Sequence, residues 1–295
     1  MSSIDWASRF EVRSLLSFSR RRKASNALYI VLATACFFVA LVPLISILYE
    51  TIARGAAAVS LAFFTQVSPP IGGNGGGVLN AIEGSLVMVG LASLIGVPVG
   101  VFAGAYLAEY PGRFGYYVRL LAEVLTGVPS IVTGIFIYEL IVATEHRFSA
   151  FSGGVALGVM MVPIVAISTH ESLKLVSSSI REGGLALGIS RAKTLVYILL
   201  SSARSGVITG IALAVARVMG ETAPLLFTAL GSQFMMTSIN DPATSLTLLI
   251  FHFGTSPYEN AHTLAWGAAL ILLVIVLSLS IVVRLASRLK VTGTE

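Results

Sequence analysis

Charge and cysteine are both scarce in this sequence. Only 11% of its 295 residues are Asp, Glu, Lys or Arg, whereas 56% are hydrophobic. A soluble protein of this length needs far more charge to cover its surface, so most of the chain must face lipid. The single cysteine, Cys36, lies in an apolar run. One cysteine excludes both a disulfide framework and a Cys-x-x-Cys zinc site.

Recognisable catalytic and nucleotide-binding patterns are missing as well. The four histidines show no metal-ligand spacing, His-Glu-x-x-His is absent, and no Ser/His/Asp set is readable. The glycine-rich run at 72–77 lacks the Lys-Ser/Thr ending of a phosphate-binding P-loop, so we expect an external turn there. The basic residues are dispersed among loops, which argues against nucleic acid. We therefore expect a non-enzymatic chain without a metal or cofactor of its own.

Long apolar runs are what the sequence does contain. They predict an all-α, polytopic membrane protein, because six segments reach the roughly 20 mostly apolar residues that a bilayer requires. The third and fifth segments are weaker, since each carries charges within the span. The spans are expected at residues 27–49, 84–108, 119–143, 148–170, 205–230 and 263–285, within a membrane domain of residues 27–290.

The distribution of Lys and Arg predicts the orientation. Of the 19 basic residues, 16 fall in the N-terminal segment 1–26, the second-to-third and fourth-to-fifth connections, and the C-terminal tail, whereas two fall in the alternate loops. Positive charge is retained on the cytoplasmic side, so both termini are predicted to be cytoplasmic. The N-terminal basic stretch precedes an apolar run too long for a cleavable signal, and that run is expected to remain as the first transmembrane helix.

The connection between the fourth and fifth spans has features of two short helices. Ser179 and Glu182 have the spacing of a capping box, Gly188 suits a left-handed helix end, and Ser190 can cap a second helix. Such a pair would expose the apolar residues around Leu185 for insertion into a groove of a partner. The alternative is an amphipathic helix lying on anionic lipid.

This connection, residues 171–204, resembles the EAA-like coupling loop by which membrane subunits of ABC importers contact their ATPase. The family usually has Ala-Ala after the Glu, and the glycines that replace it cost up to about 1 kcal/mol of helix propensity each. Those glycines could let a partner approach closely. Ser201 stands where the family usually has Pro. The resemblance implies that the ATPase-coupling residues are Glu182, Gly183, Gly184, Leu185, Gly188 and Ile198.

A second polar group falls inside the fifth span. Arg217 and Glu221 are four residues apart, which predicts that they share one helix face. At the standard helical rise, Arg217 lies roughly 20 Å from the cytoplasmic end of the span, where a charge is costly and favours a functional site. A guanidinium suits an oxyanion such as phosphate, Glu221 could neutralise it when the path is empty, and Thr222 could donate a hydroxyl. The alternative is a static salt bridge that fixes helix packing. Pro224 is expected to loosen the helix just beyond the pair, as a hinge.

Glu109 and Arg113 lie at the cytoplasmic end of the second span. We expect them to be interfacial.

The run A-R-V-M-G-E-T-A-P-L-L-F-T-A from Ala216 resembles the signature of PstA-type permeases of phosphate ABC importers. Y-L-A-E-Y from Tyr106 and V-P-S-I-V-T-G from Val128 are similar to the same family, and the similarity covers roughly residues 25–290. It implies a type I importer permease fold in a bacterial or archaeal inner membrane. It also implies a PstC-type second permease, a PstB-type ATPase dimer that binds ATP and Mg, and a PstS-type phosphate-binding protein.

Three other classes stay open at this point. An ABC permease for sulfate, molybdate or phosphonate would keep the coupling loop but lack the G-E-T-A-P-L-L run. A secondary anion transporter would keep Arg217 and Glu221 but would have no use for the loop. An intramembrane enzyme would need a nucleophile–base or metal set.

Overall fold

The computed structural model describes residues 5–110 and 112–289, and among them the side chains of residues 22–23, 25–110 and 112–285. Every regular element in this part is a helix. Residues 1–4 of the predicted N-terminal segment, and residue 290 at the end of the predicted membrane domain, lie outside the described residues. The chain divides into two compact units, Met1–Ala53 and Arg54–Glu295.

The first unit is formed by one long helix. This helix, α1 (Asp5–Ala58), begins in the first unit and ends just inside the second, and Pro43 lies within it. From residue 25 onward it is long and apolar enough to cross a membrane, with a mean hydropathy of 2.7 in its most apolar window. Membrane helices tolerate an interior proline better than soluble ones, because neighbouring groups satisfy the freed carbonyl.

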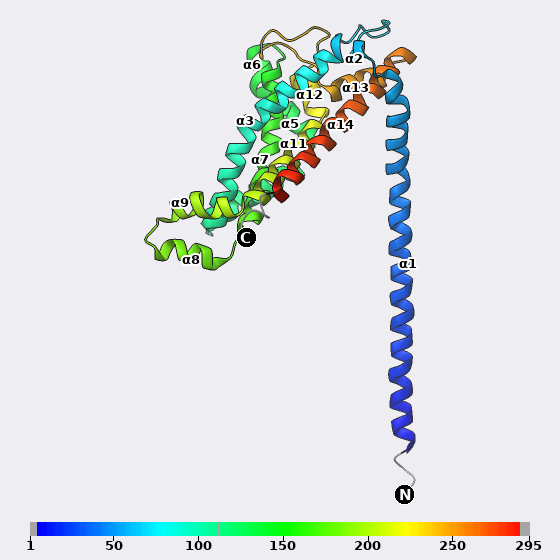
Figure 1. The fold of residues 1–295 in the computed structure, drawn as a ribbon, viewed down its shortest axis with the longest axis vertical. Helices are drawn as coiled ribbons and strands as arrows, with labels where there is room; N and C mark the ends of the chain where they lie inside the picture. Colours follow the sequence, from blue (N-terminus) through cyan, green and yellow to red (C-terminus); the bar gives the residue numbers. More distant parts are fainter. Residues whose placement is uncertain (1–4, 111, 290–295) are drawn as a thin grey trace. The chain divides into compact units, whose positions relative to one another are not determined.

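The second unit is a bundle of helices (Figure 1). Its longest helices are α3 (Leu79–Glu109), α7 (Ala150–Lys174) and α14 (Glu259–Leu289). The shorter elements are α2 (Leu61–Thr65), α4 (Arg113–Gly127), α5 (Ser130–Ile137), the π-helical turn η1 (Tyr138–Val142), α6 (Ala143–Glu145), α8 (Ser178–Ala186), α9 (Arg191–Lys193), the π-helical turn η2 (Thr194–Leu199), α10 (Leu200–Ser202), α11 (Arg204–Met219), α12 (Ala223–Thr228) and α13 (Leu246–Gly254).

The core of the second unit is the close packing of α3 along α7. Gly96, Gly100 and Gly104 lie four residues apart and so occupy one face of α3. A β-carbon at any of the three would lie within 2.8 Å of an atom of α7. Their partners on α7 follow in the same order along the chain, so the two helices run parallel. Small residues at such spacing let membrane helices approach closely, which is how these helices associate in lipid.

α11 packs on another face of α7 by the same means. A β-carbon at Gly206 would collide with Ser172, and one at Gly210 would collide with Ser168. Here the order is reversed, so α11 runs antiparallel to α7. The central apolar cluster is built mainly from these three helices, with contributions from α12, α13 and residues 229–245. Its buried members include Met88, Ala92, Leu157, Met161, Val165, Ala214, Val218, Leu225 and Leu248.

Four of the predicted spans fall within continuous helices. Residues 27–49 lie in α1, 84–108 in α3, and 263–285 in α14, while 148–170 begins two residues before α7 and lies otherwise within it. These four helices are long and apolar enough to cross a membrane.

The other two predicted spans are not single helices in the structure. α4 and the helical segment from Ser130 are bent by 103° at Val128–Pro129, where the proline disfavours helix in the residue before it. In the span 205–230, α11 ends at Met219 and α12 begins at Ala223. A second bend, of 76°, separates α11 from the segment that ends at Ser202. The number of six spans requires each bent pair to count as one, and it stays a prediction.

Candidate coupling loop and ion pathway

The predicted coupling loop lies at the end of the bundle where α3 and α7 finish, and we call this the loop end. Figure 1 shows α8 and α9 projecting there from the other helices of the unit. The apolar side chains that the loop exposes are Leu175, Ile180, Leu185, Leu187, Val196 and Tyr197. Leu187, next to the turn, is 80% exposed. An exposed apolar tip of this kind marks an interaction site.

The turn after α8 is fixed by Gly188. Its φ of +75° lies in the left-handed region that favours glycine. The Gly188 N–H donates to the Leu185 carbonyl at 3.0 Å, and the Ile189 N–H donates to the Gly184 carbonyl at 3.3 Å. These two bonds form a Schellman motif, which satisfies the last carbonyls of a helix. The predicted left-handed helix end at Gly188 is confirmed.

The predicted capping box is not formed. α8 begins at Ser178 with Ser177 at its N-cap, and no side chain caps it. The helix therefore starts before the predicted N-cap, Ser179, which lies inside its first turn. The hydroxyls of Ser177 and Ser179 share a hydrogen bond of 2.6 Å instead. Glu182 is consequently exposed on α8 and available to a partner. Ser190 does occupy the N-cap of α9, without a side-chain bond.

The two glycines that replace Ala-Ala have different surroundings. Gly184 is buried, and a β-carbon there would lie 2.9 Å from Thr194 Cγ2 and 3.1 Å from Ile198 Cδ1. Gly183 is exposed, and such a carbon would meet nothing within 4 Å. Gly184 therefore lets α8 pack on η2 inside the loop, with Ile198 in the same contact. Of the two, only Gly183 is open to the close approach of a partner.

The predicted anion pathway coincides with the break between α11 and α12. Arg217 lies in the last turn of α11 and is exposed. Glu221 and Thr222 follow the helix and are half-buried. The prediction that Arg217 and Glu221 share a helix face was wrong, because Gly220 ends the helix before Glu221 is reached. Among the described residues, no carboxylate forms an ion pair with Arg217.

Several backbone groups at this break are held by hydrogen bonds. The N–H groups of Gly220 and Glu221 donate to carbonyls of the last turn of α11, at 3.1 and 3.2 Å. The Thr247 hydroxyl of α13 donates to the Glu221 carbonyl at 2.9 Å, and Thr222 occupies the N-cap of α12. Irregular backbone at membrane depth is tolerated only when it is buried in protein or lines a water-filled cavity. The break is therefore stabilised by specific contacts within the bundle.

Pro224 does not lie within a continuous helix, where the prediction placed it as a hinge. It lies in the first turn of α12, a position that proline favours, and it is buried. A β-carbon on Gly134 of α5 would lie 2.6 Å from the Pro224 α-carbon, so the two backbones pack directly together. The interruption precedes the proline, and close packing against α5 holds the start of α12 in place.

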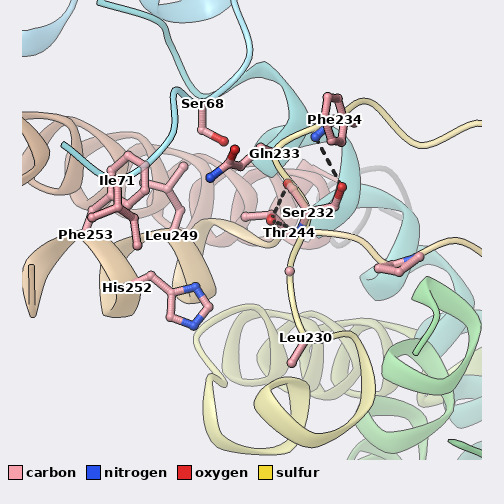
Figure 2. Close-up of a pocket in the computed structure, with 12 residues that line it drawn as sticks. Ser68, Ile71, Leu230, Ser232, Gln233, Phe234, Thr244, Leu249, His252 and Phe253 are labelled. Carbon is pink, nitrogen blue, oxygen red and sulfur yellow. Dashed lines mark hydrogen bonds between the residues drawn. The ribbon is translucent and has the colours of Figure 1, made fainter. Parts of the chain in front are cut away.

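The opposite end of the bundle, which we call the clamp end, is closed by residues 229–245. Asn80 of α3 accepts from the Ser68 N–H at 3.0 Å and donates to the Ser232 carbonyl at 2.9 Å. The Thr244 hydroxyl accepts from the Ser232 N–H and donates to the Ser232 carbonyl (Figure 2). We call Ser68, Asn80, Ser232 and Thr244 the clamp.

A cavity of about 410 Å³ lies beside the clamp, and Figure 2 shows Ile71, His252 and Phe253 among the residues that line it. Its lining contains no Lys or Arg. An anion has no strong partner there, so the cavity does not replace Arg217 as the candidate anion site.

Sequence reasoning missed two features. Glu109, expected to be interfacial, is buried at the end of α3 and lies 3.5 Å from Arg181 of α8. The glycine stripe of α3 was missed too, although its four-residue spacing is visible in the sequence. No local pattern could have found the Glu109–Arg181 pair, because its members belong to different helices.

The arrangement of helices is that of membrane subunits of ABC importers. The chain resembles the bacterial alginate ABC transporter solved with its pentasaccharide-bound periplasmic protein, with a TM-score of 0.64 at 13% identity over 93% of this chain and 98% of that one. It also resembles the MetNI methionine ABC transporter in an inward-facing form, with a TM-score of 0.56 at 16% identity over 72% of this chain and 93% of that one. The predicted importer permease fold is thereby confirmed.

The chain belongs to the family of binding-protein-dependent transport system inner membrane components, whose model matches residues 96–290. It is 42% identical to the phosphate transport system permease protein PstA of Yersinia pestis, over 89% of this chain and 90% of the relative. PstA of Haemophilus influenzae is also 42% identical, over 90% and 94%. A probable PstA of Methanocaldococcus jannaschii is 34% identical, over 90% and 94%. These relatives confirm the family indicated by the run from Ala216.

Proposed function

We propose that this chain is the membrane-spanning permease subunit of an ATP-driven phosphate importer. The observation that carries the proposal is the similarity to phosphate permeases over about nine-tenths of the chain, at 42% identity to two of them. The chain is a multi-pass component of the inner membrane. It contributes a translocation path and leaves ATP hydrolysis to a partner.

The surfaces of this single chain support an assembly. The exposed apolar tip around Leu187 suits a groove on a PstB-type ATPase, which binds ATP and Mg in the cytoplasm. A PstC-type permease forms the second half of the path, and a PstS-type protein delivers phosphate from outside. In this arrangement the loop end and both termini are cytoplasmic, as the distribution of Lys and Arg predicts.

Arg217 is the proposed transient contact for phosphate. It is exposed on the single chain and lacks a carboxylate partner among the described residues. A charge at membrane depth is expected to face a partner or a water-filled path. The C-terminal end of α11 favours a cation in its last turn, so the guanidinium is stabilised without a carboxylate that would compete with phosphate. Its planar fork suits two oxygens of an oxyanion.

Glu221 and Thr222 have supporting parts in the proposal. Glu221 is half-buried just beyond the helix end, close enough in sequence to compensate the charge of Arg217 after a small rearrangement of the break. Thr222 supplies a hydroxyl donor. Alternating access follows: ATP binding closes the ATPase, the coupling loop transmits this movement, and the path opens outward. Hydrolysis then resets it inward.

The test is uptake by the purified complex in liposomes. Phosphate should stimulate ATP hydrolysis and enter the vesicles when binding protein and ATP are both present. Parallel assays with sulfate, molybdate and a phosphonate test the other oxyanions, and uptake driven by an ion gradient without ATP would instead support a secondary transporter. Uptake of sulfate in preference to phosphate would contradict the assignment.

A further inference from the structure

The end of α3 carries a buried charge whose partner lies on the coupling loop. The side chain of Glu109 is 5% exposed, and its Oε2 lies 3.5 Å from Nε of Arg181, which is 34% exposed. That oxygen accepts no hydrogen bond from any described residue. A buried carboxylate is costly unless a charge or donor compensates it, so the position of Arg181 matters more here than at a surface pair.

This ion pair is a specific link between the loop and the bundle. Inside the loop, α8 packs against η2 through Gly184. Among the described residues, Glu109–Arg181 is the ion pair that joins the loop to α3. α3 in turn lies against α7 along its glycine stripe, and Gly104 stands one turn and a half before Glu109. A displacement of Arg181 therefore acts on the helix at the centre of the bundle.

The surroundings of the pair are incompletely bonded. Four buried side-chain atoms of the described residues lack a hydrogen-bond partner: Glu109 Oε2, Thr169 Oγ1, His170 Nδ1 and Thr194 Oγ1. All four lie at the loop end, on α3, α7 and η2. Buried polar groups are normally bonded, so this end can gain hydrogen bonds by rearranging.

We propose that Glu109 and Arg181 form the joint through which the coupling loop moves α3. Arg181 follows α8 when a partner engages the loop, and the buried carboxylate draws the end of α3 with it. Both are positioning residues, because neither touches the transported anion. The inference rests on the proposed function, since it assigns the route by which ATPase movement reaches the path.

The experiment uses the full complex in liposomes and measures anions transported per ATP hydrolysed. In Arg181→Gln this ratio should fall about tenfold or more, because the buried carboxylate loses its partner. Arg181→Lys keeps the charge and should retain a ratio close to that of the wild type. The matched control is Arg119→Gln, which breaks the exposed Arg119–Glu123 pair on α4 and should leave the ratio unchanged.

A double variant separates coupling from folding. Glu109→Gln with Arg181→Gln leaves no unpaired buried charge, so the complex should assemble, yet its ratio should stay low. A merely structural pair would instead lower transport and ATP hydrolysis in proportion, and a wild-type ratio in the double variant would overturn the proposal.

The same assay keeps the two proposals apart. The ratio is measured for whichever oxyanion the wild-type complex moves, so a complex that transports sulfate would refute the phosphate assignment and still test the joint. A wild-type complex that hydrolyses ATP without moving any anion would overturn both.

Discussion

The two ends of the bundle satisfy their polar groups in opposite ways. At the clamp end, Asn80 bonds the backbone of 229–245 to α3, and Thr244 bonds Ser232 within that segment. Ser152 of α7 also donates to the Thr228 carbonyl at 2.7 Å. At the loop end, four buried side-chain atoms of the described residues lack a hydrogen-bond partner, and one of them is the Glu109 oxygen that lies 3.5 Å from Arg181. Bonded networks rigidify the segments that they join, whereas unsatisfied groups favour a second arrangement.

This difference indicates at which end of the bundle a partner can move the helices. The clamp end can only lose hydrogen bonds by rearranging, so it resists change. The loop end can gain them, and it carries the exposed coupling loop. The break between α11 and α12 lies between the two, with Arg217 on the α11 side. Alternating access requires one end that a partner can move, one end that stays fixed, and a flexible point between them. In this proposal these are the loop end, the clamp end and the break between α11 and α12.

The largest effect is expected at the break itself. Changing Arg217 to Gln removes the proposed phosphate contact and should abolish phosphate uptake while assembly is intact. Radioactive phosphate uptake and co-purification of the complex measure the two properties. Arg147→Gln, which removes an exposed charge paired with Glu145, is the matched control and should transport normally. Retained uptake in Arg217→Gln would show that Arg217 has only a structural role.

The next effect tests the loop end. A bulky, β-branched residue at Gly188 must adopt a φ near +75°, which costs about 1–3 kcal/mol and distorts the turn that holds α8. Gly188→Val should therefore uncouple the ATPase, measured as loss of its stimulation by binding protein. Gly188→Asn is the control, since asparagine tolerates the left-handed region better than other residues. Equal stimulation in both variants would show that this turn does not transmit movement.

α3 connects the two ends of the bundle. Its glycine stripe can be tested with a control glycine that lies on the same helix outside the stripe. Gly104→Val forces α3 away from Thr169 and should lower stability by about 1–3 kcal/mol. Gly90 lies on the same helix with nothing within 4 Å, so Gly90→Ala should be neutral or stabilising by up to about 1 kcal/mol. Thermal unfolding of the detergent-solubilised complex measures both. A neutral Gly104→Val would contradict the close packing.

The sequence predicts what local composition determines. The apolar runs indicate the long helices, and Gly188 indicates a helix end because glycine alone adopts that conformation at little cost. The break at Val128–Pro129 has a local cause, since proline disfavours helix in the residue before it, and it could have been read from the sequence. The break at Gly220 was missed because tertiary contacts settle it: Thr247 holds the Glu221 carbonyl, and Gly134 admits Pro224. The same limit applies to the joint of Glu109 and Arg181, whose members come together only when α8 folds back toward α3.

The smallest effect on transport is expected at the clamp, which should stabilise the fold without transmitting movement from the ATPase. Asn80→Ala removes an amide that bonds both Ser68 and Ser232, and it should lower stability by about 1–3 kcal/mol because buried partners are left unsatisfied. Asn240→Ala removes an exposed side chain of the same type and should be neutral. Anions transported per ATP should be unchanged in both, since a rigid end that is slightly weakened still stays fixed during the cycle. A lowered ratio in Asn80→Ala would mean that movement reaches the clamp end as well, and the contrast between the two ends would then not describe how the subunit works.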